Sequence, residues 1–278
     1  MSKSLFPDIF YEYKQAKEIG FIHDIDQITC ISCGPDRIAF ASNKHSKVIY
    51  SSISSPSTHT INIELPNKSN LLRLEWLSAE PFSLLVIFEL SLVIIDTQTN
   101  TIIHQIHIEN SSDIIRDAHW TPQGNILCLT HNNVLVLYDQ NLENSIIQNE
   151  INDEQSYCLA IDNNQIFIGH SRKVKVYEMN PETFQIIKRT EFIAHPHNID
   201  QILVTKDHLI TLTDNDAVAW DKSDFVPLFP IKTKGSTLFV DPDGFLGITS
   251  EGTVLKLMNG KKSKIMNQLP LKDFNIES

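Results

Sequence analysis

Apolar residues lie along this chain in short runs that are separated by polar turn residues. The stretch "NNVLVLYDQN", residues 132–141, shows the pattern: an unbroken run of valine, leucine and tyrosine ends in an aspartate and is flanked by asparagines. A half-exposed strand would alternate apolar and polar residues, and an amphipathic helix would repeat them with a helical period. A short run that is apolar at every position instead predicts a strand buried on both faces.

The same run recurs through the chain in altered form. Counterparts of "VLVLYD" are "LVIID", "KVKVYE" and "AVAWD", with weaker copies in "KVIYS" and "VLKLMN". Each copy has one anchor position near its end, and the anchors are Tyr50, Ile95, Tyr138, Tyr177, Trp220 and Met258. Successive anchors are 45, 43, 39, 43 and 38 residues apart. A period of this length is the signature of a repeat architecture.

Each repeat reads as four short strands. A second apolar strand and a turn of Gly, Pro, Asn or Asp precede each anchor run, a further apolar strand precedes that turn, and a more polar strand follows the anchor. Four strands in a fixed period of about 40 residues predict a β-propeller. The middle strands of a blade are packed between neighbouring blades, which explains why "VLVLY" is apolar on both faces. The expected fold is all-β: a single propeller over 25–278 with about six four-stranded blades.

The repeats resemble those of WD40 proteins. The endings "AWD" (219–221) and "LYD" (137–139) look like the Trp-Asp ending of a WD40 repeat, and the fifth unit matches best. The resemblance implies a hydrogen-bonded network inside that blade, formed by His195, by Asp214 or Asp216, and by Trp220. The other units lack the tryptophan at the anchor, and no unit has a Gly-His pair upstream of its first strand. Units three and six also look like the repeats of the six-bladed NHL family, so the subfamily stays open.

Composition narrows the classes of function. A net charge of −11 over 278 residues repels phosphate backbones, so no nucleic-acid partner is expected. The cluster of Lys256, Lys261, Lys262 and Lys264 is interpreted as a solvated turn. No apolar run reaches the roughly 18 residues that a membrane helix needs, so membrane insertion is not expected. Four cysteines do not form a disulfide framework in a chain of this length, which favours a reducing, cytoplasmic location.

Candidate chemistry is sparse. The "CISC" pair, Cys30 and Cys33, lies on an expected strand, where residues three apart point to opposite faces, so we expect two buried, inert thiols. Phosphate-binding glycine loops and a nucleophile elbow are absent from the sequence. Some histidines and aspartates stand near expected strand ends and could meet at one mouth of a propeller channel, as in metal-dependent propeller hydrolases. They are His119, His131, His170, Asp117, Asp162, Asp214 and Asp241.

The main hypothesis is a non-enzymatic scaffold that binds other proteins within a larger complex, without a cofactor or a metal. The alternative is a metal-dependent hydrolase or lactonase with its site at the channel mouth. One apolar segment in the fourth strand of unit five either packs under a loop or binds a partner. Its residues are Phe225, Val226, Leu228, Phe229 and Ile231.

Ring closure is the remaining question in the sequence. Residues 1–24 are too apolar for a free tail, so they are expected to form a closing strand or cap, with 16–22 adding to the sheet edge of unit six. That addition could displace the fourth strand assigned to unit six. Alternatively a partner donates a strand or a whole blade, because an exposed sheet edge offers unpaired backbone groups. Either route could raise the number of blades to seven.

Overall fold

The structure is a computed structural model. It describes residues 29–34, 37–42, 47–52, 58–65, 69–77, 82–109, 113–151, 154–214 and 216–232, and the backbone of the strands within 236–240, 246–250, 253–258 and 261–268. These residues include 24 strands. In the described part of the chain, no helix has the length and hydrophobicity needed to cross a bilayer.

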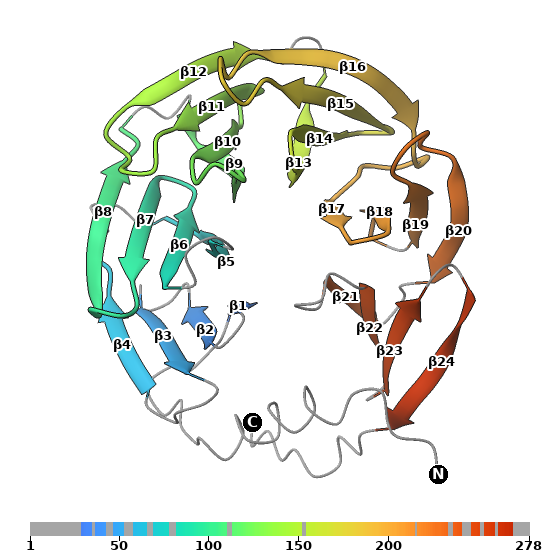
Figure 1. Ribbon diagram of the computed structural model, residues 1–278, viewed down its shortest axis with the longest axis horizontal. Helices are drawn as coiled ribbons and strands as arrows, with labels where there is room; N and C mark the ends of the chain where they lie inside the picture. The colour runs from blue at the N-terminus through green and yellow to red at the C-terminus, as the bar shows by residue number, and fades with distance from the viewer. Residues whose placement is uncertain are drawn as a thin grey trace. The chain divides into compact units, whose positions relative to one another are not determined.

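The strands form six four-stranded sheets, which we call blades 1 to 6, and each sheet uses four strands that are consecutive in the chain (Figure 1). Blade 1 contains β1 (Cys30–Cys33), β2 (Arg37–Ser42), β3 (Lys47–Ser52) and β4 (Thr58–Asn62). Blade 2 contains β5 (Leu71–Trp76), β6 (Ser83–Phe88), β7 (Ser91–Asp96) and β8 (Thr101–His107). Blade 3 contains β9 (Ile115–Trp120), β10 (Ile126–Thr130), β11 (Val134–Tyr138) and β12 (Ser145–Glu150).

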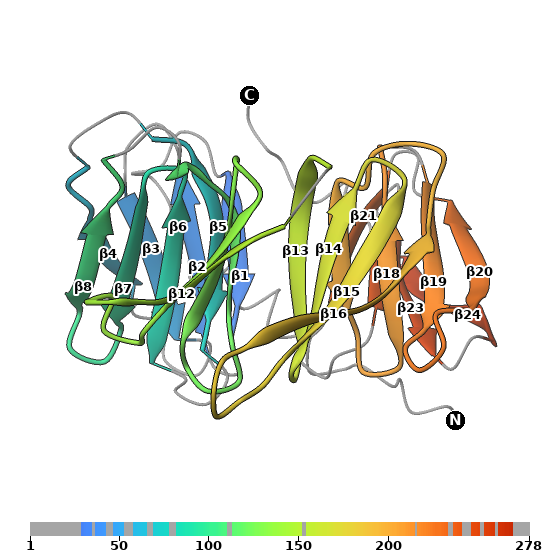
Figure 2. The same ribbon diagram turned by 90° about the horizontal axis from the view of Figure 1, so that it is seen from above.

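The second half of the chain repeats this arrangement. Blade 4 contains β13 (Ser156–Asp162), β14 (Gln165–His170), β15 (Lys173–Met179) and β16 (Ile186–Ile193). Blade 5 contains β17 (Gln201–Val204), β18 (His208–Leu212), β19 (Asp216–Asp221) and β20 (Pro227–Lys232). Blade 6 contains β21 (Ser236–Val240), β22 (Leu246–Ser250), β23 (Thr253–Met258) and β24 (Lys261–Gln268). Figure 2 shows the strands of single blades side by side.

The chain forms two compact units. The first comprises 1–156, 163–165 and 178–187, and the second comprises 157–162, 166–177 and 188–278. Blades 1 to 3 therefore belong to the first unit, and blades 5 and 6 to the second. Blade 4 contributes to both.

The middle strands of the blades are buried, as the apolar runs predict. All six residues of β6 are buried, and so are the central three of β11, the strand of the "VLVLY" run. One apolar cluster joins blades 1 and 2 through residues such as Tyr50, Trp76 and Ile95, and a second joins blades 2 and 3. In the second unit, a further cluster joins blades 4 and 5 around Trp220. The six four-stranded sheets confirm the predicted repeat of four strands, and the described middle strands of blades 1 to 5 show the predicted burial.

Two tryptophans link successive first strands. Trp76, at the end of β5, donates a hydrogen bond from Nε1 to the carbonyl oxygen of Ser32 in β1, at 3.2 Å. Trp120, at the end of β9, donates from Nε1 to the carbonyl oxygen of Glu75 in β5, at 3.3 Å. The Trp76 ring also packs against Gly34, where a Cβ atom would lie 3.0 Å from ring atom Cγ. Each indole thus combines an apolar contact area with a satisfied donor.

The prediction of two buried thiols in "CISC" is wrong. Along β1 half-buried residues alternate with exposed ones, so Cys30 is half-buried and Cys33 is exposed. Only every second side chain of β1 is covered, so two cysteines three residues apart differ in exposure. Burial raises the pKa of the Cys30 thiol. Cys128 and Cys158 are the two buried cysteines.

The predictions about ring closure fall largely outside the described residues, because 1–28 are not among them. One part of the question can be answered within blade 6. Its fourth strand is β24, which pairs antiparallel with β23 through Met258 and Lys261 at one end and Thr253 and Gln268 at the other. The chain's own strand therefore occupies the sheet position that residues 16–22 could have taken over.

Candidate functional site

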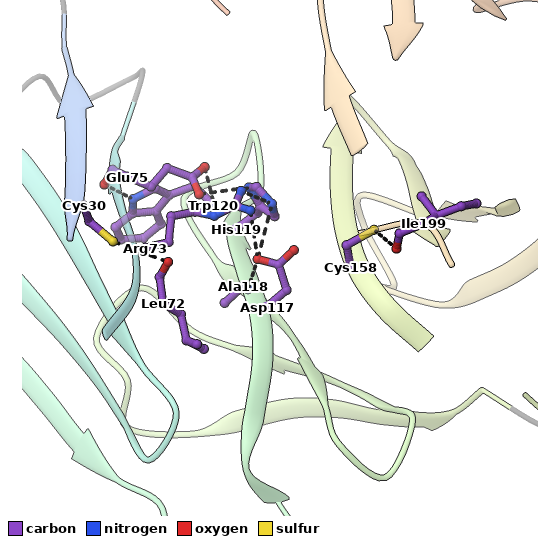
Figure 3. A network of polar contacts seen from close by, with 10 residues as sticks. All are labelled: Cys30, Leu72, Arg73, Glu75, Asp117, Ala118, His119, Trp120, Cys158 and Ile199. Atoms are coloured by element: carbon purple, nitrogen blue, oxygen red, sulfur yellow. Dashed lines mark hydrogen bonds and ion pairs between the residues drawn. The ribbon is translucent and has the colours of Figure 1, made fainter. Parts of the chain in front are cut away.

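A cluster of four ionisable side chains connects the first strands of blades 2 and 3 (Figure 3). Arg73 and Glu75 come from β5, and Asp117 and His119 come from β9. Each pair is two residues apart, so alternation along a strand places both members of the pair on one face. Because β5 and β9 contact each other, the two pairs meet.

The guanidinium of Arg73 is at the centre of this cluster. Its Nη2 lies 3.2 Å from Asp117 Oδ1, and its Nη1 lies 2.6 Å from His119 Nε2. An arginine only donates hydrogen bonds, so Nε2 of His119 must accept, and the imidazole is neutral with its proton on Nδ1. That Nδ1 lies 2.9 Å from Glu75 Oε2. The order of partners from Asp117 to Glu75 is therefore carboxylate, guanidinium, neutral imidazole, carboxylate.

Glu75 also binds the backbone of the next blade. Its Oε1 accepts a hydrogen bond from the backbone N–H of Trp120 at 3.3 Å, and its carbonyl oxygen accepts from the indole of the same residue. Side-chain exposure is 8% for Asp117 and 14% for His119, against 27% for Arg73 and 25% for Glu75. The cluster is thus a partly buried polar contact that fixes blade 2 against blade 3.

Of the candidate residues for a hydrolase site, the structure brings two together and leaves the other described ones apart. Asp117 and His119 do lie together, but Arg73 stands between them as a fixed cation. Asp162 forms an ion pair with Lys222 instead. His170 is fully buried, His131 is exposed, and Asp241 lies outside the described residues. Within the described ranges, no group of three or more His, Cys, Asp or Glu side chains is arranged to hold a metal ion.

Blade 5 contains a second polar network. Trp220 donates from Nε1 to the hydroxyl oxygen of Thr211 at 2.8 Å, and His195 Nε2 lies 2.8 Å from the same oxygen. His195 Nε2 is also 3.2 Å from the Thr211 carbonyl oxygen. All three residues are buried. Burial lowers the pKa of His195 below its ordinary value, which keeps the imidazole neutral near pH 7.

The two aspartates that the sequence left open for this network differ in their surroundings. The charge of Asp216 acts on His195 and partly offsets the effect of burial on its pKa. Asp214 is exposed and faces Asp200 instead. Burial, followed by the nearby Asp214 charge, raises the pKa of Asp200. Asp216 is therefore the aspartate that couples electrostatically to His195.

The other expected anchors lie in the third strands of their blades. Tyr50 and Ile95 are buried, and the Tyr50 hydroxyl donates to Asn100 Oδ1 at 2.7 Å. Tyr138 and Tyr177 are half-buried, and burial raises the pKa of each phenol to about 12. The side chain of Met258, at the end of β23, lies outside the described residues.

The predicted partner-binding segment divides into two groups. Phe225 stacks on Phe192 with ring centroids 5.1 Å apart and packs on the cluster around Trp220. Ile231 is buried in the cluster that includes Ile210, Ala217 and Ala219. Val226 and Leu228 are 50% and 44% exposed. The side chain of Phe229 is not described. The segment therefore packs with some residues and presents the others to solvent.

Sequence reasoning missed Arg73, Glu75 and Thr211 as members of these networks. A signal was present for the first two. "LLRLEW" and "IRDAHW" carry charged or imidazole side chains at the third and fifth positions of equivalent strands. Thr211 had no comparable signal, because threonine is common in strands owing to its β-propensity and needs no further explanation there.

Three solved structures illustrate how this fold compares with known proteins. The chain is 16% identical to the WD40 repeats of RRP9, with a TM-score of 0.66, and the match covers 87% of this chain and 80% of that one. For U3-55K the values are 17%, 0.64, 84% and 77%. For the Myceliophteria thermophila Cps50 (Swd1) β-propeller domain they are 11%, 0.65, 81% and 80%. No family model matches the chain, and no curated protein does.

These comparisons establish the fold. The chain has the β-propeller fold of these WD40-repeat structures, so the all-β fold class is confirmed, and the resemblance inferred from "AWD" and "LYD" holds at the level of the fold. Identities of 11–17% carry the fold alone, and the biochemical role has to be argued from the chain's own surface.

Proposed function

We propose that this protein is a non-enzymatic scaffold that binds other proteins as a subunit of a larger complex. The β-propeller fold supports a protein-interaction role in general. In each of its two polar networks, the ionisable groups bind one another or the backbone. Arg73 contacts Asp117 and His119, and His195 contacts Thr211.

The observation that carries the proposal is the exposed apolar surface at the start of β20. Val226 and Leu228 are 50% and 44% exposed and flank Pro227. Ile193, at the end of β16 in the same unit, is 75% exposed. Phe192 and Phe225, the chain neighbours of Ile193 and Val226, stack on each other, so these aliphatic residues belong to one locality. An apolar patch beside a rigid aromatic contact is suited to a protein partner.

The test is affinity purification of the full chain from its native cells, with identification of the co-purifying proteins. The variant Val226→Asp/Leu228→Asp should lose at least one partner while its melting temperature stays close to that of the wild type. Ile103→Asp is the matched control, because Ile103 is a similarly exposed aliphatic residue, at 47%, on the fourth strand of blade 2. An identical set of partners for all three proteins would overturn the proposal for this surface.

The metal-dependent hydrolase is the second candidate: His119 lies 2.9 Å from Glu75 and 3.8 Å from Asp117, although the described side chains do not form a metal-binding group there. A cation would have to replace Arg73 between them. Metal analysis of the purified protein and of Arg73→Ala tests this idea. Stoichiometric zinc or calcium in the wild type would favour the enzyme, and metal only in the variant would show that Arg73 excludes it. The cytoplasmic location stays a prediction.

A further inference from the structure

The fourth strands of several blades share an irregularity. In blades 2, 3 and 5 the register between the third and fourth strands shifts next to the anchor residue, at Ile94/Ile95, Leu137/Tyr138 and Ala219/Trp220. The extra residue on the fourth strand is Ile103, Ile146 or Leu228. A bulge of this kind interrupts the ladder and twists the strand, which discourages a further strand from pairing with the edge.

The remaining fourth strands of blades 4 and 6 have other protections. β16 carries Lys188 and Arg189, and β24 carries three lysines, Lys261, Lys262 and Lys264, together with register shifts. The bulged β20 also contains Pro227 and Pro230. Charged side chains and prolines on an edge act against strand addition in the same way as bulges.

The fourth strand of blade 1 differs from all of these. β4, "THTIN", has no lysine, arginine or proline, and its register with β3 runs unbroken from Lys47–Asn62 to Ser51–Thr58. Four of its five residues are exposed, and Ile61 is the buried one. Its position is also fixed. His59 stacks on Tyr50 at 5.3 Å, and Gln105 of blade 2 donates to the Glu64 carbonyl oxygen just beyond the strand.

We propose that β4 accepts an extended segment of another protein as a fifth strand of blade 1. Among the described strands, none pairs with the outer edge of β4. Backbone pairing at such an edge supplies the affinity in strand addition. This inference rests on the proposed scaffold function and adds a second docking element to it, in the first compact unit rather than the second.

The exposed side chains indicate the chemistry of the segment. Thr58, Thr60 and Asn62 alternate along one face of β4 and are uncharged. Threonine pairs favourably with threonine, serine and β-branched residues across antiparallel strands. A segment rich in acidic residues would be repelled by a chain of net charge −11, and proline would remove the donors needed for the ladder. The partner segment is therefore uncharged or basic, β-branched and free of proline.

The experiment uses the full chain as bait for a displayed library of random dodecapeptides. Recovered peptides should be β-branched and free of proline. They should bind about tenfold or more weakly to Thr58→Lys/Thr60→Lys, since edge lysines block pairing. The matched control is Thr101→Lys/Ile103→Lys in β8, where both positions are exposed and the edge already has a bulge. This control should bind the peptides as the wild type does, and peptides N-methylated at every amide should fail to bind any of the three proteins.

The outcomes separate the two proposals. If no recovered peptide depends on Thr58 and Thr60, strand addition at β4 is wrong, whatever the result at Val226 and Leu228. A peptide that keeps its affinity when its amides are methylated also contradicts backbone pairing. Light scattering tests whether a second copy of this chain binds at β4. If the wild type is a dimer and Thr58→Lys/Thr60→Lys is a monomer, β4 mediates self-association and does not bind a segment of another protein. Loss of partners at Val226 and Leu228 with intact peptide binding at β4 would support both surfaces.

Discussion

The indole of Trp220 and the hydroxyl of Thr211 are joined by a hydrogen bond of 2.8 Å in the buried centre of blade 5. The same hydroxyl contacts His195, so a single threonine side chain satisfies two buried ring nitrogens. The hydrogen bonds in the buried centre of blade 5 therefore depend on the hydroxyl of Thr211.

Replacing Thr211 with valine should destabilise the protein strongly for an isosteric change. The substitution leaves Trp220 Nε1 without its acceptor and His195 Nε2 without the hydroxyl, and each buried polar group without a partner costs about 1–3 kcal/mol. Urea denaturation of Thr211→Val measures the loss in the free energy of unfolding. Thr190→Val, at an exposed position of β16, is the control and should change stability by no more than about 0.5 kcal/mol. Equal stability of the two variants would contradict the network.

Removal of the whole Trp220 side chain should cost more. Trp220 is 5% exposed and packs against Phe192 at 4.8 Å between ring centroids. Large-to-small changes of aromatic core residues cost about 3–5 kcal/mol, because the cavity that remains only partly collapses. The melting temperature of Trp220→Ala checks this value. An unchanged melting temperature would show that Trp220 does not anchor blade 5.

Stability should fall as the pH is lowered below about 6.5, the ordinary pKa of histidine. The pKa of His195 is lowered in the folded state, mainly by burial, so the unfolded chain binds this proton more readily. The stabilisation is therefore complete above the unfolded pKa and is lost as pH falls from there through the folded pKa. Burial and the nearby Arg116 also lower the pKa of His131, with the same sign.

Melting temperatures between pH 8 and pH 5 test this dependence. His195→Gln should flatten the curve between pH 6.5 and pH 5 relative to the wild type. His59→Gln is the matched control, because His59 is an exposed histidine of blade 1 and is not among the groups that act on His195. A variant curve parallel to that of the wild type would mean that His195 does not titrate differently in the two states.

Asp200→Asn should raise stability at pH 7. The pKa of Asp200 is raised by burial and by the Asp214 carboxylate, so this group favours the folded state only at low pH. That contribution is lost as pH rises through the folded pKa, and amidation removes the repulsion. The comparison is Asp207→Asn, an exposed aspartate in the turn between β17 and β18. A melting temperature that falls in Asp200→Asn and not in Asp207→Asn would reverse our interpretation of the pair.

The cluster between blades 2 and 3 should show strong coupling. Arg73→Met leaves the carboxylate of Asp117, which is 8% exposed, without its cation. An uncompensated charge that is buried away from water costs up to about several kcal/mol of stability. The double variant Arg73→Met/Asp117→Asn should recover part of that loss, with a coupling free energy of about 0.5–3 kcal/mol. Arg189→Met, at an exposed position of β16, serves as the reference. Additive losses in urea denaturation would show that the two side chains do not interact.

Periodicity in the sequence predicted the sheets well, because burial on both faces forces a middle strand to be apolar at every position. "SLLVIF" and "VLVLY" needed no other information. The polar clusters were less accessible. Arg73 meets His119 only because two strands 46 residues apart are brought together by packing, and no local pattern records that pairing. The exposure of Cys33 was also not predictable: only every second side chain of β1 is covered, and the sequence of that strand does not reveal which ones.

The segment 225–231 shows the same limit of sequence-based prediction within a single segment. Its apolar composition predicted either burial or partner binding. It could not predict that Phe225 and Ile231 are packed inside while Val226 and Leu228 are exposed. Two irregularities accompany that division: a left-handed backbone at Phe225, with φ of 57°, just before β20, and the register shift at Leu228. An aromatic residue in that conformation has no sequence signature, because glycine or asparagine is the residue expected there.

In the indole hydrogen bonds of Trp76 and Trp120, the acceptor is synthesised before the donor. Each acceptor carbonyl precedes its tryptophan in the chain, by 44 residues for Ser32 and by 45 for Glu75. During synthesis on the ribosome, the docking strand of one sheet therefore leaves the exit tunnel before the tryptophan that needs it. Chains are completed from the N-terminus at about 5–20 residues per second, so blade 2 can settle on blade 1 seconds before blade 3 is made. Assembly in the first compact unit can thus follow the order of translation, and no sheet in it has to wait for a later one to satisfy its tryptophan.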